Sequence, residues 1–313
     1  MQDISAVIEQ AVAVAAQPKK SKGRPPSDKK TKQPVAAAVI QAPETADAMF
    51  EMHSNNPVLF KKMFTILKKY HVSEIELVIS HTGWSFETQS NDRTVVLHGR
   101  VNAAHQVRYF TTQQFRIWLS VSELSSKFDE VGPDHSMVKF MLCNATKTDT
   151  LHIILSDAKQ GTTTFETVSA CPQEAVREAI PHMQDDDYPL KFSVKHGHVK
   201  KKLTGTAKSQ VRGALIIQKI GVGHVQMSVE KDGKAGGATV YEKTECATTL
   251  KPDDVLMAKV PTSALKGLVS QAIGPDIRIC ADYKRHASFS NYLLGDTQPG
   301  VVAEMKIYIP LNA

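Results

Sequence analysis

From residue 48 onward, the hydrophobic positions of the chain alternate between helical and strand spacing. The clearest helical stripe has the spacing i, i+3, i+4, i+7 and comprises Phe60, Met63, Phe64 and Leu67. Asn56 is a good N-cap residue and Pro57 suits the first helical position. We therefore expect an amphipathic helix that begins at Asn56.

Alternating, β-branched and aromatic segments predict the strands of the first half of the chain. The expected strands are Glu74 to Ser80, Trp84 to Gln89, Thr94 to Val101, Tyr109 to Leu119, Met137 to Cys143, Thr150 to Ser156 and Thr162 to Val168. A second helix is expected between them, over Ser122 to Val131.

The same succession of elements returns after residue 187. The expected strands are Leu190 to Val194, Ala214 to Ile220, His224 to Val229, Ala238 to Glu242, Val255 to Val260, Ile277 to Tyr283, Ala287 to Leu293 and Val302 to Ile309. Helices are expected over Val199 to Gln210 and Ser263 to Ile273.

The two halves form an internal repeat. The segment Leu59 to Lys62 corresponds to His198 to Lys201, an offset of 139 residues, and Val131 to Asp134 corresponds to Ile273 to Asp276. In both copies a Gly-Pro-Asp sequence ends a helix, because Gly adopts the left-handed C-terminal conformation and Pro cannot continue the helix. The predicted fold class is α+β, with two similar domains over residues 48–170 and 188–313 and a connector over residues 171–187.

The charges are sorted along the chain, which adds a functional signal to this fold. Lys and Arg number 38 against 32 Asp and Glu, and the whole excess of 6 is carried by residues 18–34. Tyr188 to Val229 contains eight Lys or Arg and no acid, whereas the preceding Cys171 to Asp187 is acidic. Because clustered cations attract phosphate at long range, we expect one basic face on a folded body whose charges otherwise balance.

Residues 1–47 are expected to form a disordered basic tail, because they are rich in Ala, Val, Gln, Pro and Lys and contain no aromatic side chain. The sequence Lys22-Gly23-Arg24-Pro25 matches the core of an AT-hook. An extended arginine flanked by proline can enter the narrow minor groove of A·T-rich DNA. A generic basic tail and a nuclear localisation signal are alternative interpretations.

Other classes of function lack support in the sequence. No apolar segment reaches the roughly 18 residues of a membrane-spanning helix, and the N-terminus lacks the features of a secretory signal. The four cysteines are widely spaced without a C-x-x-C pair, which is typical of reduced thiols in an intracellular protein. His196 and His198 resemble a metal-ligand pair, but no further ligands complete a site. We therefore expect no metal, no cofactor and no catalytic residue.

Several segments together resemble proliferating cell nuclear antigen (PCNA), the DNA sliding-clamp family. They are Asn56 to Lys69, Ile79 to Glu87, Phe115 to Val131, Asp149 to Leu155 and Glu304 to Pro310. The Gly-Arg-Pro-Pro tail, the Asn-Pro-x-Leu-Phe-Lys opening and Tyr188-Pro189-Leu190 look most like the clamp-like proteins of large cytoplasmic DNA viruses. The resemblance covers residues 48–313, and the order and spacing of the segments are its specific part.

The resemblance implies a homotrimeric ring with two clamp domains per subunit. Helices would line the hole, sheets would lie outside, and duplex DNA would pass through without sequence-specific contacts. DNA polymerase and other replication or repair proteins would dock short peptides beside the connector. The family has no catalytic site and no cofactor.

The resemblance and the charge pattern together give three sets of candidate residues. The DNA-facing set is Lys61, Lys62, Lys68, Lys69, Lys127, Lys200, Lys201, Lys202, Lys208, Arg212 and Lys266. The partner-peptide pocket is Val96, Ile180, Tyr308 and Pro310. The subunit interface is expected at strand edges that carry Ile153 and Val240. A merely solvated helix face is the alternative interpretation of the lysines.

Three positions depart from the family pattern. The connector lacks the usual Leu-Met-Asp-Leu run, and Ile180-Pro181 is the nearest match to its Ile-Pro. Gln89 stands where the pocket has an apolar residue, and the fourth helix offers Lys266 alone.

The sequence thus predicts a DNA sliding clamp and polymerase processivity factor, located in the host cytoplasm at a viral replication site or in the nucleus. The alternative is a non-ring DNA-binding or architectural protein that uses its AT-hook-like tail.

Overall fold

The first predicted helix forms with the expected cap. In the computed structural model, helix α2 spans Pro57–Lys69, and the Asn56 Oδ1 accepts a hydrogen bond from the Leu59 amide at 3.1 Å. The predicted apolar stripe is buried along this helix. The structure describes residues 47–143, 149–172, 188–207, 213–220, 224–231, 234–241, 246–248, 250, 256–282, 286–295 and 299–311.

The first repeat comprises the elements up to residue 172. Its strands are β1 (Ala48–Ser54), β2 (Glu74–Ser80), β3 (Gly83–Gln89), β4 (Val96–Asn102), β5 (Arg108–Thr111), β6 (Phe115–Ser120), β7 (His135–Cys143), β8 (Thr150–Asp157) and β9 (Thr162–Ser169). Besides α2, it contains the short 3₁₀ helix η1 (Ala103–His105) and helix α3 (Val121–Lys127).

The second repeat comprises the elements after residue 187. Its strands are β10 (Leu190–Lys195), β11 (Gly213–Ile220), β12 (His224–Lys231), β13 (Lys234–Ala235), β14 (Thr239–Tyr241), β15 (Cys246–Thr248), β16 (Met257–Pro261), β17 (Asp276–Ala281), β18 (His286–Leu294) and β19 (Val301–Pro310). Its helices are α4 (His196–Ala207) and α5 (Thr262–Ser270).

The strand pairing confirms that the two repeats are built alike. The first repeat pairs its strands in the order β5-β1-β7-β8-β9, and the second in the order β15-β10-β17-β18-β19. A second group follows β6-β2-β3-β4 in the first repeat, and β16-β11-β12 with β14 on β12 in the second. Each repeat therefore has two sheets, and its helices pack between them and against the core.

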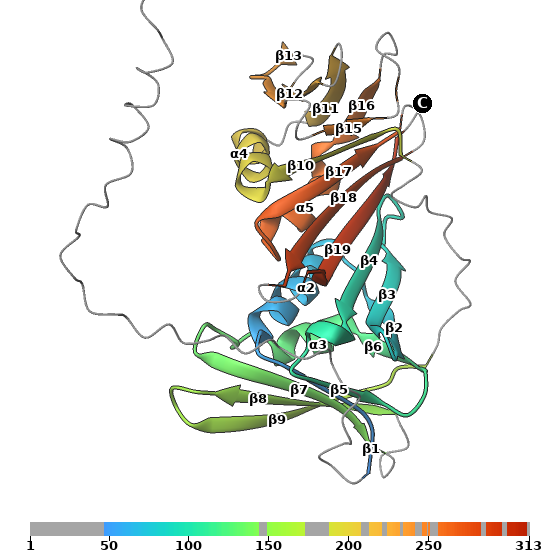
Figure 1. Cartoon of the computed structure of the whole chain (residues 1–313), viewed down its shortest axis with the longest axis vertical. Helices are drawn as coiled ribbons and strands as arrows, with labels where there is room; N and C mark the ends of the chain where they lie inside the picture. The colour runs from blue at the N-terminus through green and yellow to red at the C-terminus, as the bar shows by residue number, and fades with distance from the viewer. Residues whose placement is uncertain are drawn as a thin grey trace, which may run out of the picture. The chain divides into compact units, whose positions relative to one another are not determined.

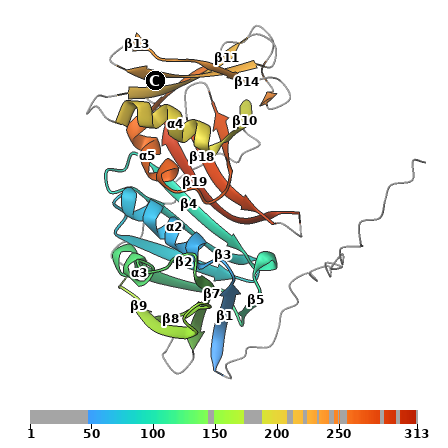
Figure 2. The ribbon, with the colours of Figure 1, turned by 90° about the vertical axis from the view of Figure 1, so that its left-hand side faces the viewer.

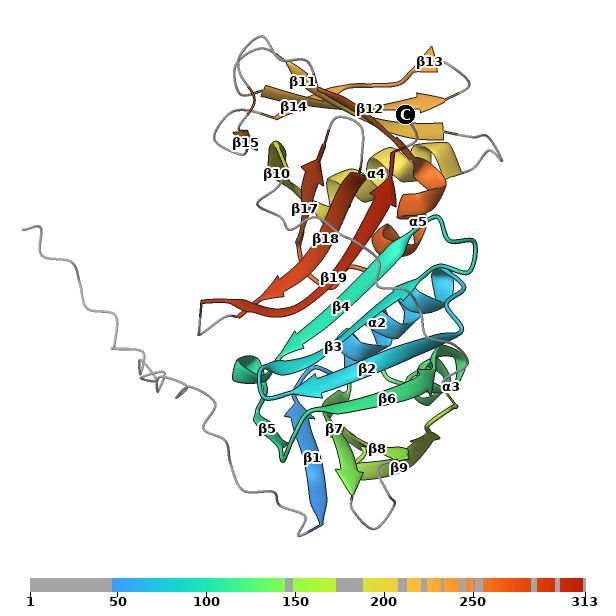
Figure 3. The ribbon, with the colours of Figure 1, turned by 90° about the vertical axis from the view of Figure 1, so that its right-hand side faces the viewer.

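One continuous nine-stranded sheet joins the repeats. Strand β19, the last of the second repeat, pairs antiparallel with β4 of the first repeat over six residue pairs, from Ala303 and Val101 to Tyr308 and Val96. Figure 3 shows this sheet across both repeats, and Figure 2 shows the helices α2 to α5 gathered on the opposite side. The described residues accordingly belong to one compact unit, and the domain boundaries given above stay predictions.

The core of the first repeat is a cluster of aromatic side chains beneath α2. Phe60 lies 4.9 Å from Phe140 and 5.3 Å from Trp84, measured between ring centroids. Phe64 packs on Phe128 at 5.2 Å. Edge-to-face and tilted pairs of this kind add specific geometry to the burial of apolar area.

Three sequence expectations need correction. The single strand expected over Tyr109 to Leu119 is two strands, because β5 pairs with β1 whereas β6 pairs with β2 in the other sheet. The strands β1, β13 and β15 are additions to the expected set; in β1 the alternation is hidden by Glu51 and His53, which are buried polar residues. Helix α3 ends at Lys127, four residues earlier than expected. The other boundaries agree to within about three residues.

No helix among the described residues is long and apolar enough to cross a membrane.

Candidate nucleic-acid interface

Exposed lysines mark the helical side of the described structure. Lys68 and Lys69 occupy the last turn of α2, where positive charge is favoured by the helix dipole. Lys200 and Lys201 are exposed on α4, and Lys266 is exposed on α5. The sequences of α2, α4 and α5 contain no acidic residue. The three helices therefore present cations without carboxylates on their own surfaces, which suits contact with phosphate.

Other predicted lysines are engaged by groups of the protein itself. The Lys61 Nζ donates to the carbonyls of Asp129 and Val131, both at 2.7 Å, and so supports the turn after α3. The Lys127 Nζ lies 2.9 Å from a carboxylate oxygen of Glu166 on β9.

Lys202 also donates a hydrogen bond to a carbonyl of the protein. Its Nζ donates to the Gly237 carbonyl at 3.1 Å, and burial lowers its pKa. A contact within the protein is therefore already made by three of the lysines predicted to face DNA: Lys61, Lys127 and Lys202.

A cross-repeat cluster of bases lies where α2 of the first repeat meets α4 and α5 of the second. His196, the first residue of α4, is buried, and its Nε2 has no hydrogen-bond partner. Burial lowers the pKa of His196, and the nearby cations Lys200 and Lys62 lower it further. Burial also lowers the pKa of Lys62. Two predicted DNA-facing lysines from different repeats thus act on one buried imidazole.

Two of the residues predicted to line the partner pocket are neighbours in the structure. Val96 and Tyr308 are cross-strand partners at the junction of β4 and β19, and both are buried. The Lys306 Nζ lies 4.8 Å from the centre of the Tyr308 ring, a cation–π distance. Pro310 is exposed at the end of β19. Gln89, the departure from the family pattern, stands opposite Val96 and donates through its Nε2 to the Arg93 carbonyl at 3.1 Å.

Ile153, predicted to lie at a subunit interface, does not lie at a sheet edge. It belongs to β8, which is hydrogen-bonded to β7 on one side and to β9 on the other, and its side chain is 0% exposed. A residue buried in its own core cannot contact a neighbouring subunit. The edge of this sheet is β9, on which Phe165 is 74% exposed.

The other predicted edge does lie at the border of its sheet. Strand β14 pairs with β12 alone among the described residues, and Val240 on β14 is 53% exposed. Figure 1 shows β9 among the strands of the first repeat, and Figures 2 and 3 show β14 in the second. Within the described part of the chain, both strands therefore leave backbone donors and acceptors open for pairing.

Some predicted site residues lie outside the described residues: Lys22, Gly23, Arg24, Pro25, Ile180, Lys208 and Arg212. Among the residues that are described, no group of three or more His, Cys, Asp or Glu side chains is arranged to hold a metal ion.

Two residues have surroundings that the sequence pattern did not predict: His196, buried near two lysines, and Phe165, exposed on an edge strand. His196 resembles a metal ligand in the sequence, but the relevant signal is its position at the start of a lysine-rich helix. Phe165 carries a signal as the single large apolar residue in a strand otherwise rich in threonine.

Comparisons with known proteins agree with this architecture. No family model matches the chain. An uncharacterized protein of African swine fever virus is 20% identical over 282 residues, which span 86% of this chain and 92% of that protein.

Among solved structures, PCNA from Entamoeba histolytica superposes with a TM-score of 0.68 at 10% identity, covering 85% of this chain and all of that one. The PCNA2–PCNA3 complex from Sulfolobus tokodaii gives a TM-score of 0.67 at 8% identity, over 83% of this chain and 98% of that one. The chain therefore has the fold of PCNA.

Proposed function

We propose that this protein is a DNA sliding clamp: a homotrimeric ring that encircles duplex DNA and tethers a DNA polymerase and other replication or repair proteins. The proposal rests on the fold it shares with PCNA and on the lysines of α2, α4 and α5, three helices without an acidic residue. Its contribution would be topological and electrostatic, without a catalytic step. Contacts to phosphate carry no sequence information, so such a ring could slide.

The observation that carries the ring is the junction between β19 and β4. Within the chain, the last strand of one repeat pairs with the fourth strand of the other. The repeat makes β9 equivalent to β19 and β14 equivalent to β4, and both equivalents lie at sheet edges. Pairing β9 of one subunit with β14 of the next would repeat the same junction between chains. A head-to-tail contact of this kind generates a closed ring when its rotation permits.

The ring can be tested by placing a charge at each edge. Phe165→Asp or Val240→Asp should convert a trimer into monomers in light scattering, because an unpaired carboxylate would be buried at the junction. Val107→Asp is the matched control, since Val107 is 52% exposed outside both edges. A wild-type monomer would contradict the ring and favour a non-ring DNA-binding protein. Trimers in both edge variants would contradict the assigned junction.

DNA contact is proposed for Lys62, Lys68, Lys69, Lys200, Lys201 and Lys266, with smaller contributions from Lys61, Lys127 and Lys202. Lys208 and Arg212, which lie outside the described residues, remain part of this prediction. Reversing Lys200 and Lys201 to Glu should weaken binding to duplex DNA on both A·T-rich and G·C-rich sequences. The slope of log affinity against log salt should become shallower by about 0.9 for each phosphate that the protein no longer neutralises.

A control for that experiment makes the same charge change elsewhere. Lys159 and Lys195 are exposed residues of the β8–β9 turn and of β10, outside the helices α2 to α5. Reversing both to Glu should leave most of the affinity and the salt slope. An equal loss in both double variants would show a general charge effect and would remove the helical surface as the DNA site. Retention on closed circular DNA with release from linear DNA would test encirclement directly.

A partner pocket is proposed around Val96, Tyr308 and Pro310, with Ile180 of the connector at its rim. A pocket of this kind takes a short motif anchored by an aromatic residue. Tyr308→Ala should abolish stimulation of the partner polymerase while the trimer persists. Tyr292→Ala is the control, because Tyr292 lies on β18 opposite Glu304, farther along the same sheet. Loss of stimulation in both variants would indicate general damage to the sheet.

The tail would supply a second DNA contact through Lys22, Gly23, Arg24 and Pro25. Deleting residues 1–45 should keep the trimer and lower DNA affinity several-fold, through the loss of effective concentration. The loss should be larger on A·T-rich duplex, and Arg24→Ala should reproduce most of it. Equal losses on both duplexes would leave a generic basic tail, and no loss would point to a targeting segment.

A further inference from the structure

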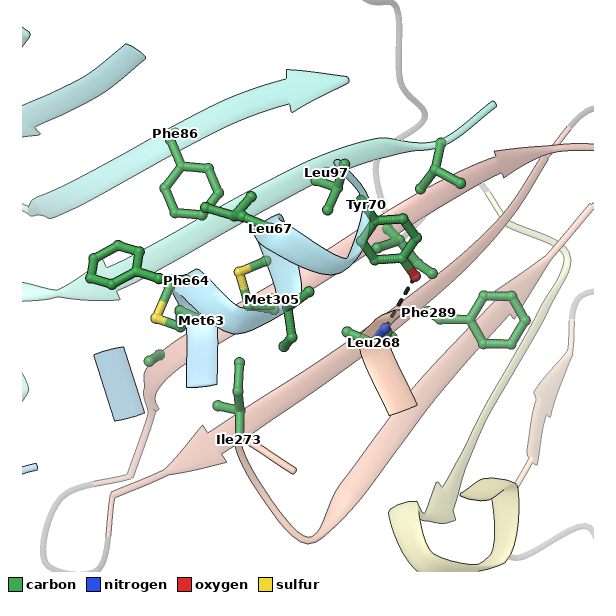
Figure 4. Packing of buried hydrophobic residues seen from close by; sticks show 14 of the residues in the cluster. Met63, Phe64, Leu67, Tyr70, Phe86, Leu97, Leu268, Ile273, Phe289 and Met305 are labelled. Carbon is green, nitrogen blue, oxygen red and sulfur yellow. Dashed lines mark hydrogen bonds between the residues drawn. The ribbon is translucent and has the colours of Figure 1, made fainter. Parts of the chain in front are cut away.

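Tyr70 connects the two repeats on their helical side. It follows α2 directly, and its side chain is buried. Its hydroxyl donates to the Ala264 carbonyl at 2.7 Å and accepts from the Leu268 amide at 3.1 Å, both on α5 of the second repeat. Figure 4 shows the ring between α2 and α5 with the bond to Leu268. One hydroxyl therefore uses both its donor and its acceptor capacity across the junction.

The position of this hydroxyl along α5 is specific. Ala264 and Leu268 are four residues apart, so their carbonyl and amide are the pair that a regular α-helix would bond to each other. The Tyr70 oxygen lies between these two groups and serves both. Because the contact is to backbone groups at one turn, it fixes where α2 meets α5 along the helix, which an apolar contact alone would not.

Gly267 provides the space for the ring. A Cβ added at Gly267 would overlap the Tyr70 ring, with Cε2 as the nearest atom. The backbone of this glycine is not left-handed, so the ring is what requires the missing side chain. Glycine in a helix interior costs about 0.5–1 kcal/mol relative to alanine. A tyrosine in one repeat and a glycine in the other are thus matched to each other.

The opposite side of the junction is the β19–β4 ladder, whose six registered pairs make the sheet continuous. Neighbouring strands in a sheet differ in twist over a range of roughly 10–35°. A ladder alone therefore holds two bodies together without fixing the angle between them. A second attachment on the other side of the strands removes that freedom.

We propose that Tyr70 and Gly267 form a clasp that fixes the angle between the two repeats of each chain. The clasp acts with the β19–β4 ladder as a two-sided attachment. The contact lies within one chain: a buried phenol hydroxyl of the first repeat bridges two backbone groups of a helix in the second repeat.

The sequence does not repeat the tyrosine and the glycine at the equivalent positions. The offset of 139 residues that aligns α2 with α4 places Ser209 opposite Tyr70, and α3 carries Ser125 and Ser126 where α5 carries Gly267. If the ring of the proposed function forms, its junctions between subunits would rest on strand pairing without the phenol bridge. This consequence depends on the proposed function.

The clasp can be tested on the full-length protein by hydrogen exchange. Tyr70→Phe should speed exchange of the Leu268 amide roughly fivefold or more, because that amide loses its hydroxyl acceptor. Tyr109→Phe is the matched control: its buried hydroxyl donates to the Ser80 carbonyl at 2.8 Å within the first repeat. The control should leave the Leu268 amide unchanged. Equal exchange in wild type and Tyr70→Phe would overturn the clasp.

A second experiment tests the match between the two residues. Gly267→Ala should lower the melting temperature in the wild-type background, where the ring occupies the space. In a Tyr70→Ala background the same substitution should be neutral or stabilising, because the space is empty. An equal loss in both backgrounds would overturn the match and with it the clasp.

The angle itself is read by small-angle scattering. Tyr70→Phe should broaden the distribution of distances within a chain, whereas Tyr109→Phe should not. An unchanged distribution in Tyr70→Phe would contradict the proposed role in fixing the angle. These measurements need neither DNA nor a ring, so a failed clasp and a failed sliding-clamp function give different results: monomeric wild type with a normal clasp would refute only the ring.

Discussion

Equivalent helices of the two repeats are anchored differently. Helix α2 inserts Phe60 and Phe64 into an aromatic cluster, whereas the corresponding positions of α4 are Val199 and Leu203. The first repeat therefore fixes its helix by large rings of defined geometry, and the second by aliphatic contacts of smaller area.

The lysines follow the same division. Lys61 of α2 bonds two carbonyls of its own repeat, whereas Lys200 at the equivalent position of α4 is exposed. The first repeat thus uses part of its basic surface to hold itself together.

Core truncation should give the largest contrast between the repeats. Phe64→Ala should lower the free energy of unfolding by about 3–5 kcal/mol, since it removes a buried ring that packs on Phe128. Leu203→Ala, at the equivalent position, should cost about 2–5 kcal/mol and less than the first variant. Urea unfolding of both variants measures the difference. A larger loss for Leu203→Ala would reverse our ranking of the two cores.

Neutralising the two equivalent lysines should separate stability from DNA binding. Lys61→Met should lower the free energy of unfolding by about 1–2 kcal/mol, because two carbonyls lose a charged donor, and should change DNA affinity little. Lys200→Met should lower DNA affinity, because Lys200 is exposed on a helix without an acidic residue. Chemical denaturation and DNA titration at one salt concentration test the pair. Identical behaviour of the two variants would show that the helices do not divide these roles.

The free energy of unfolding should depend on pH through the protonation of His196. Its pKa in the folded protein is lowered from 6.5 by burial and by Lys200 and Lys62, so the unfolded chain binds a proton first as pH falls. Stability contributed by neutral His196 is thus fully present above about pH 6.5 and declines below it.

DNA binding should show the reverse dependence on pH. Phosphates near Lys62 and Lys200 would offset their repulsion of the imidazolium and raise the pKa of His196. Binding would then take up a proton, and affinity should rise as pH falls toward the lowered pKa of His196 in the free protein. DNA titrations from pH 5 to 8 measure this, with His196→Gln expected to remove the extra dependence. Exposed His81 is the control for substitution; a pH dependence unchanged by His196→Gln would exclude the coupling.

The smallest contrast concerns surface ion pairs. Lys127 and Glu166 in the first repeat are 2.9 Å apart and about one quarter to one third exposed, whereas the Lys195 side chain of the pair Lys195–Asp276 is 67% exposed. Lys127→Ala should cost up to about 1 kcal/mol and Lys195→Ala less, because solvent screens the more exposed pair. Thermal unfolding at low and high salt measures both. A larger salt-dependent loss for Lys195→Ala would contradict this order.

Most helices and strands could be predicted from local pattern. The Asn56 cap, the α2 stripe and the limits of β2 agree with the sequence expectation, because each depends on residues a few positions apart. The internal repeat and the acid-free basic helices are readable for the same reason. Together with the family resemblance these features indicate the clamp fold, and the TM-score of 0.68 to a PCNA supports it.

Pairing between distant segments could not be predicted in this way. Alternation marks Thr150–Asp157 and Thr162–Ser169 equally well as strands, and only the pairing of β8 on both sides shows that Ile153 is internal and Phe165 lies at the edge. Likewise, the lysine pattern could not show that Lys61 would meet carbonyls about 70 residues away.

The sequence by itself determined the elements, their repetition and the basic character of the helices, since these arise from neighbours along the chain. The tertiary structure decided which strands are edges, which lysines are committed to the protein, and how Tyr70 meets Gly267. Those outcomes depend on hydrogen bonds and close packing between distant segments, such as those of Tyr70 and Leu268, which are 198 residues apart. A single sequence carries no local signal for such contacts.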